Sequence, residues 1–351
     1  MDTLRDNNAT PPDRLNEDWR FGRPHVHAQE LMQLLAERPG DEGDIAIEAA
    51  HSIGNLTIGG SSEQPAAAWA PIGSGYLVQQ ALAKTTERLE LSLAGQMDSP
   101  FVIRCEARGF YTPCLSITIE PGSRAHIVER HVHSSGSALL CLRRYTVMPG
   151  ASLTLELIEE GCGDSRAMNI SCLDCRGECR VRQLTTHRDH AWAREETTAV
   201  LTAQAAAAPE LLLLSANHLR GEQWLDQRTR QLHMSPGGKS QLLYKNVLDE
   251  HATAIFGGNI RVEPAAHETD AYLSNLNLML SEHATMHSLP GLEILADRVR
   301  CSHGSATAPM DPDRLFYLRS RGIDAPTART ILAEGFLADV RSKFLAPIEK
   351  L

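Results

Sequence analysis

A thiol and an imidazole lie two residues apart late in the chain, at Cys301 and His303. Alternate residues of a β-strand point to the same face, so on a strand these side chains would lie side by side. A thiolate is a soft ligand and an imidazole a borderline one, which suits iron, zinc or an iron–sulfur cluster. Two ligands do not close a tetrahedral site, so others must come from elsewhere or from a second subunit. Without them, the spacing alone indicates packing, with Cys301 as a small buried residue and His303 as a hydrogen-bonded turn residue.

The densest cluster of thiols comprises Cys162, Cys172, Cys175 and Cys179. A Cys-x2-Cys-x3-Cys run can hold zinc or an iron–sulfur cluster. No second Cys-x2-Cys pair accompanies it, and the sequence that follows from Arg180 is typical of a strand. The four thiols are therefore a candidate metal site whose fourth ligand the pattern does not fix. In a β-solenoid they could lie on different faces.

Two histidines, His131 and His133, resemble the metal motif of cupins. That motif needs a glutamate three or four residues after the second histidine, and here residues 134–137 are Ser, Ser, Gly and Ser. The pattern leaves a dyad without its third ligand. It predicts two histidines on a solvated strand face, and it leaves open the alternative of a cupin-like metal-dependent enzyme.

The composition excludes some classes of function. The net charge of the 351-residue chain is −10 and only 5% of its residues are aromatic, whereas nucleic-acid binding needs concentrated Lys and Arg. The first residues are polar, without the apolar core of a signal peptide. The most apolar run, near 205–214, is interrupted by Pro209 and Glu210 and is too short to span a bilayer. We expect a cytoplasmic protein without membrane or nucleic-acid partners, whose cysteines are thiols or ligands rather than disulfides.

The elements that must position these residues are mostly strands. From about residue 44 to 308, short alternating segments such as 89–93, 115–119 and 153–157 are separated by turn signals that include Pro121-Gly122 and Pro149-Gly150. Late in the chain, strand-like pieces recur about every 14 to 17 residues, a spacing that fits one coil of a parallel β-solenoid. An antiparallel sandwich with irregular loops is the alternative that the spacing leaves open.

Helices are expected only at the two ends. Residues 1–43 predict a flexible arm followed by a short helix over 28–38. Residues 309–351 predict two helices, the first capped by Asp311 with Pro312 at its first position and the second beginning at Asp324. The second helix has an apolar face, and packing of that face on the β-body is the default expectation. Its residues are Ala328, Ile331, Leu332, Phe336, Val340 and Phe344.

An ordered series of segments between about 220 and 337 resembles the SufB/SufD core family of the SUF iron–sulfur cluster assembly machinery. The similarity is close there and looser over 45–220, and 16–20 also resembles a short motif that precedes the family's β-core. Family members usually carry a longer helical region before that motif, and the cluster from Cys162 to Cys179 is not part of the family pattern. The matching segments are Asp226–Arg230, Leu242–Glu250, Ala254–Gly258, Thr269–Tyr272, Leu292–Asp297, Cys301–Gly304 and Leu315–Ile323.

The resemblance implies a right-handed parallel β-helix over 44–308 and a non-enzymatic scaffold that pairs with SufB, or with itself in isolation. It implies a nascent iron–sulfur cluster held transiently near the SufB/SufD interface, with no permanently bound cofactor. His303 then corresponds to an assembly ligand, and Cys301 is the weaker candidate. Ser302 and Leu318 place the chain nearer the SufD side of the family than the SufB side. The helices of 309–351 are implied to dock the ATPase SufC, through Leu315, Phe316, Leu318, Ile331 and Phe336.

Overall fold

The computed structural model describes residues 33, 41–48, 56–59, 75–85, 87–97, 99–204 and 207–346. The expected N-terminal arm and the helix over 28–38 lie outside these residues, apart from Gln33 and the start of the first strand. No helix in the described ranges is both long and apolar enough to cross a bilayer.

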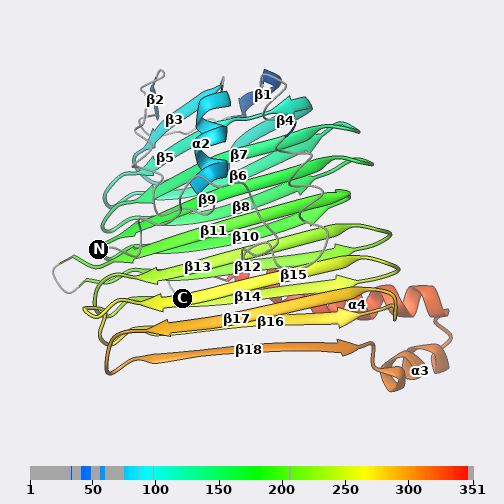
Figure 1. Ribbon diagram of the computed structural model, residues 1–351. Helices are drawn as coiled ribbons and strands as arrows, with labels where there is room; N and C mark the ends of the chain where they lie inside the picture. The colour runs from blue at the N-terminus through cyan, green and yellow to red at the C-terminus, as the bar shows by residue number, and fades with distance from the viewer. Residues whose placement is uncertain are drawn as a thin grey trace.

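Strands make up most of the described chain (Figure 1). The first nine are β1 (Asp41–Glu48), β2 (Leu56–Gly59), β3 (Arg88–Leu93), β4 (Phe101–Tyr111), β5 (Cys114–Ile119), β6 (Arg124–His133), β7 (Ala138–Val147), β8 (Ser152–Glu160) and β9 (Arg166–Arg176). The others are β10 (Arg180–Arg188), β11 (Trp192–Thr202), β12 (Glu210–Leu219), β13 (Trp224–His233), β14 (Lys239–Leu248), β15 (Thr253–Val262), β16 (Asp270–Met279), β17 (Thr285–Ile294) and β18 (Arg300–Pro309). The helices are α2 (Gly75–Lys84), α3 (Pro312–Ser320) and α4 (Ala325–Leu345).

From β3 onward, each strand pairs in parallel with the next strand but one, so the chain forms a parallel β-solenoid of two stacked sheets (Figure 1). The odd-numbered strands from β3 to β17 form one sheet, and the even-numbered strands from β4 to β18 form the other. The predicted solenoid is confirmed. Antiparallel pairing among the described strands is limited to β1 with β4 and β2 with β3. The sandwich alternative is therefore wrong, and so is the cupin-like enzyme, because cupins are antiparallel jelly rolls.

The length of one coil differs from the sequence-based expectation. Lys239 of β14 pairs with Asp270 of β16, and Asp270 in turn pairs with Arg300 of β18. One strand of the facing sheet lies between each of these strands and the next along the chain, so each coil holds two strands and two corners. The recurrence predicted from the sequence is therefore only half a coil, because one strand of each coil lies in each sheet.

Glycines with positive φ form several of the corners. Gly122 has φ +69° and Gly150 φ +76°, a conformation that a residue with a Cβ rarely adopts. Each follows a proline, whose fixed φ suits the preceding turn position. The Pro-Gly pairs seen in the sequence thus turn the chain from one sheet to the other.

Apolar side chains fill the space between the sheets and also cover parts of both outer faces. On the odd-numbered sheet, Val78 and Ala81 of α2 pack with Leu140 and Trp192. On the even-numbered sheet, α4 packs on β10, β12 and β14 (Figure 1). Its buried residues are Ala328, Ala333, Val340 and Phe344. The expected packing of this helix on the β-body is confirmed.

The predicted starts of both helices are confirmed, but the predicted apolar face is partly wrong. The Asp311 side chain accepts hydrogen bonds from the backbone at the start of α3, and Asp324 caps α4 through Thr327 N at 2.9 Å. Ile331 is 43% exposed, whereas Ala333, which the pattern did not include, is buried. The sheet therefore contacts a face of α4 that is rotated from the one that residue type favoured.

Candidate functional site

The last coil, β17 and β18, leaves one end of the solenoid open (Figure 1). Among the described strands, β18 pairs with β16 and β17 with β15, and neither has a strand on its other edge. No residue of either strand is buried. A free parallel edge offers unpaired backbone donors and acceptors together with a half-covered core.

Cys301 and His303 both lie on β18, as the spacing predicts for a shared strand face. In the parallel register they stand opposite Ala271 and Leu273 of β16, which are core residues. Cys301 is half-buried against this core, and burial raises the pKa of its thiol. His303 is exposed although Leu273, its equivalent one coil earlier, is fully buried. His303 is thus an inward-facing core position that no further coil of the described chain covers.

A row of hydrogen-bonded polar side chains lies inside the solenoid and extends toward this open end. Asn217 Nδ2 donates to Asn246 Oδ1 at 2.8 Å, and Asn246 Nδ2 donates to Asn277 Oδ1 at 3.1 Å. These three residues lie in register on β12, β14 and β16. On the last coil, Ser305 Oγ donates to Ser288 Oγ at 2.7 Å. Polar side chains inside the solenoid therefore extend as far as Ser305, which is two residues from His303 on β18.

The structure does not bring the four clustered cysteines together. Cys162 is exposed, Cys172 lies in the outer cluster beneath α2, and Cys175 and Cys179 lie in the core between the sheets. Cys172 and Cys175 are separated by an odd number of positions on β9, so they face opposite sides. A hydrogen bond with Cys179, together with burial, raises the pKa of Cys175 well above its ordinary value.

The two histidines of β6 are buried, which corrects the expectation of a solvated strand face. The exposed fractions of His131 and His133 are 1% and 4%. They continue the inward-facing positions of Ala125 and Ile127 at the period of two. Polar residue types on a strand usually indicate its solvated face, but on β6 these two side chains occupy the inward-facing positions.

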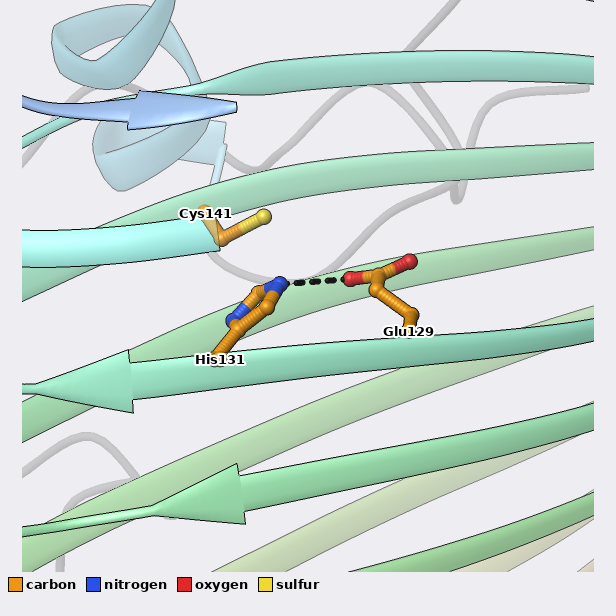
Figure 2. A group of neighbouring side chains, drawn as sticks. All are labelled: Glu129, His131 and Cys141. Atoms are coloured by element: carbon orange, nitrogen blue, oxygen red, sulfur yellow. Dashed lines mark ion pairs between the residues drawn. The ribbon is translucent and has the colours of Figure 1, made fainter. Parts of the chain in front are cut away.

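Carboxylates that the local motif lacks come from elsewhere in the fold. Glu129 precedes His131 by two residues, and Glu159 stands opposite His131 on β8, one coil later. His131 Nε2 lies 2.7 Å from Glu129 Oε1 (Figure 2), and His131 Nδ1 lies 3.1 Å from Glu159 Oε1. His131 and Glu159 are separated in the sequence by about the length of a whole coil, so that spacing would have linked them. The spacing predicted from the sequence is half a coil and does not link them.

Arg143 crosses from the facing sheet to complete a buried ionic group with Glu129, His131 and Glu159. Its Nη2 donates to Glu159 Oε1 at 2.9 Å, and its Nε lies 3.1 Å from Glu129 Oε1. Burial lowers the pKa of His131, but the carboxylates of Glu159 and Glu129 outweigh it and raise that pKa to about 9. Burial raises the pKa of Cys141, the thiol beside this group (Figure 2). Each charge here faces an opposite charge, so the group is a closed salt-bridge network.

The two C-terminal helices differ in exposure. No residue of α3 is buried, and Phe316 and Tyr317 are 73% and 56% exposed. Leu315 and Leu318 are half-buried, and Leu315 lines a groove of about 470 Å³ between the ends of β16 and β18 and the helices. Phe336 instead lies against the chain, with Lys245 Nζ 4.5 Å from its ring centroid. Of the residues expected to dock a partner, Phe316 and Ile331 are the most accessible.

Comparison with known proteins shows which family the chain belongs to. A family model described as "SUF system FeS cluster assembly, SufBD core domain" matches residues 101–336, more than half of the chain. The chain belongs to the SufBD core family. It is 36% identical over 137 residues to the iron–sulfur cluster assembly SufBD family protein slr0076 of Synechocystis, covering 39% of this chain and 30% of that protein.

Two further relatives show a similar level of identity. The chloroplastic protein ABCI7 of Arabidopsis thaliana is 40% identical over 124 residues, covering 35% of this chain and 26% of that protein. The iron–sulfur cluster assembly protein SufD of Escherichia coli is 36% identical over 115 residues, covering 33% of this chain and 27% of SufD. The matched stretch thus spans less than a third of each of these relatives.

Proposed function

We propose that this chain is a SufD-type scaffold subunit in SUF iron–sulfur cluster assembly, and that its open end binds a SufB-like subunit. The position of His303 carries the proposal. It occupies a core position of the last coil, opposite the fully buried Leu273, yet it is exposed. A partner that adds strands to β17 and β18 would cover this position and satisfy the free edges, as in other cases of β-strand addition. His303 would then lie within the interface.

The chemistry at this interface is that of an incomplete site. His303 supplies one borderline ligand, and Cys301 is a weaker candidate because it is half-buried against the core with a raised pKa. A thiolate from the partner would complete a set suited to iron and sulfide, which are the cargo of the scaffold. The cluster is held transiently, and the chain itself catalyses no reaction. The eight free cysteines fit a reducing compartment such as the cytoplasm.

We further propose that α3 and the exposed side of α4 dock a SufC-like ATPase. α3 has no buried residue and presents the exposed aromatic side chains of Phe316 and Tyr317. Aromatic side chains commonly anchor protein interfaces. ATP-dependent dimerisation of the ATPase would move these helices relative to the solenoid. That movement would bias the interface between two states and admit iron and sulfide to His303.

Substitution of His303 in the assembled complex tests the assembly site. The chain is co-expressed with SufB and SufC, and cluster formation on the purified complex is followed by iron and sulfide content and visible absorption. We expect His303→Ala to reduce cluster formation at least about 10-fold, since even loss of an outer-shell partner costs that much in metal affinity. His283→Ala, an exposed histidine in a corner, is the matched control. Full cluster assembly by an intact His303→Ala complex would exclude the role of His303.

Substitution of α3 tests the docking surface separately. We expect Phe316→Asp with Tyr317→Asp to abolish co-purification with the ATPase without weakening the association with SufB. Leu345→Asp is the control, since Leu345 is 79% exposed at the far end of α4. Retention of the ATPase by the α3 variant would show that docking occurs elsewhere. A homodimer through the open end, in the presence of SufB, would contradict the proposed pairing.

A further inference from the structure

A second group of ligand-type side chains lies beside the buried salt-bridge network and is built differently. Ligand atoms of His133, Glu159 and His190 all lie within 4.8 Å of one another. His133 ends β6, Glu159 lies on β8, and His190 follows the end of β10. These three strands are adjacent in one sheet. The group therefore joins three successive coils of the solenoid.

Several polar atoms of this group lack hydrogen-bond partners within the described chain. Both ring nitrogens of His133, Oε2 of Glu159 and Nε2 of His190 make no hydrogen bond there, and neither ring nitrogen of His187 does. His133 Nε2 and Glu159 Oε2 lie 3.5 Å apart, and all four side chains are at most 4% exposed. A buried polar group without a hydrogen-bond partner destabilises the folded state, so such clusters are rare without a bound species. A single cation at their centre would satisfy several of these atoms together.

The local backbone makes room for this arrangement. A Cβ at Gly161 would lie 2.6 Å from both Cγ and the backbone nitrogen of His190, so only glycine permits this approach. Nδ1 of His190 lies 3.2 Å from Ser165 Oγ, and this contact leaves Nε2 free to face Glu159 and His133. Outer-shell hydrogen bonds of this kind orient the histidine ligands of metal sites.

The donor set indicates which cation fits. Two imidazoles and one carboxylate suit Zn²⁺ or Fe²⁺, whereas Ca²⁺ and Mg²⁺ prefer oxygen ligands throughout.

We propose that His133, Glu159 and His190 bind one divalent cation of the zinc class inside the solenoid, where it ties three coils together. His187 stands opposite Glu159 on β10, and its ring centroid lies 6.4 Å from that of His190. It is the nearest candidate for a fourth ligand, which would close the site as in structural zinc centres. In the adjacent group of Glu129, His131 and Cys141, Oε1 of Glu129 is already within 3.1 Å of both His131 Nε2 and Arg143 Nε. Arg143 contacts Glu159 only through Oε1, so Oε2 of Glu159 faces His133 at 3.5 Å and is available to a cation. This inference does not depend on the proposed function.

The experiment uses the full chain, produced in zinc-supplemented medium and dialysed against a weak chelator. Elemental analysis counts zinc and iron per chain, and Co²⁺ replacement reports the coordination geometry by visible absorption. We expect about one metal ion per chain and an intense Co²⁺ spectrum typical of four-coordinate sites. We expect His133→Gln and His190→Gln to lose the ion, and Ser165→Ala to bind it about 10–100-fold more weakly.

Two controls separate this site from its surroundings. His233→Gln removes a fully buried histidine whose Nε2 lies 2.9 Å from Ser240 Oγ, outside the group, and should retain the ion. Cys141→Ser should also retain it, because Cys141 belongs only to the neighbouring group. If Cys141→Ser loses the metal and His190→Gln retains it, the ion is bound by the group of Glu129, His131 and Cys141, and the proposal is wrong. A wild-type chain that holds no zinc, iron or Co²⁺ overturns the proposal whatever the variants do.

Discussion

Arg143 is the residue whose removal should most weaken the solenoid interior. It is fully buried and holds Glu129 and Glu159 at 3.1 and 2.9 Å, and it donates to Asn169 Oδ1 at 2.6 Å. Arg143→Met would keep most of the side-chain volume but would leave the carboxylates of Glu129 and Glu159 without their guanidinium partner. Breaking a buried ion pair by removing one partner costs about 3–5 kcal/mol. This is a large part of the roughly 5–15 kcal/mol by which domains are typically stable.

Arg144→Met is the matched control, one residue along the same strand. Its guanidinium pairs with Asp174 on the outer face at 2.9 Å, and the two side chains are 17% and 11% exposed. Because solvent remains near this pair, we expect a loss of about 1 kcal/mol. Urea unfolding followed by circular dichroism measures both variants. Adding Glu129→Gln to Arg143→Met should restore part of the loss, because it removes one unpaired charge. Equal destabilisation by the two arginine variants would refute the reasoning.

Two further predictions concern pH and the docked helix. Burial raises the pKa of Glu195 from its ordinary 4.5 to about 7, so the folded state binds this proton more tightly and its stability falls as pH rises from about 4.5 through 7. Glu195→Gln should remove about 3 kcal/mol of that fall, at about 1.36 kcal/mol per pKa unit, and parallel stability–pH curves for the two proteins would contradict this. Phe344→Ala should lower the free energy of unfolding by about 3 kcal/mol, because Phe344 is 7% exposed against β10 and β12. Leu345→Ala, at 79% exposure, should change it by less than about 0.5 kcal/mol, and similar effects of the two substitutions would show that α4 does not pack as described.

Several features of this chain follow from the sequence because they depend on neighbouring residues. Asp311 with Pro312 and Asp324 begin the two C-terminal helices where hydrogen-bond geometry requires a cap. Gly122 and Gly150 turn the chain at corners because their backbone conformation excludes most other residues. The shared strand of Cys301 and His303 follows from a spacing of two. Each of these depends on contacts within a few residues.

Other features were decided only by tertiary structure, because they join residues one coil apart. The parallel pairing of each strand with the next strand but one fixes the length of a coil. No local pattern in the sequence distinguishes a whole coil from half of one. The same stacking places Glu159 opposite both His131 and His187, which turns an apparent surface dyad into a buried cluster. It also exposes His303 while burying Leu273, since exposure at this position depends on whether another coil follows. Residue types limited the chemistry available to this protein, and the stacking of coils determined which side chains meet.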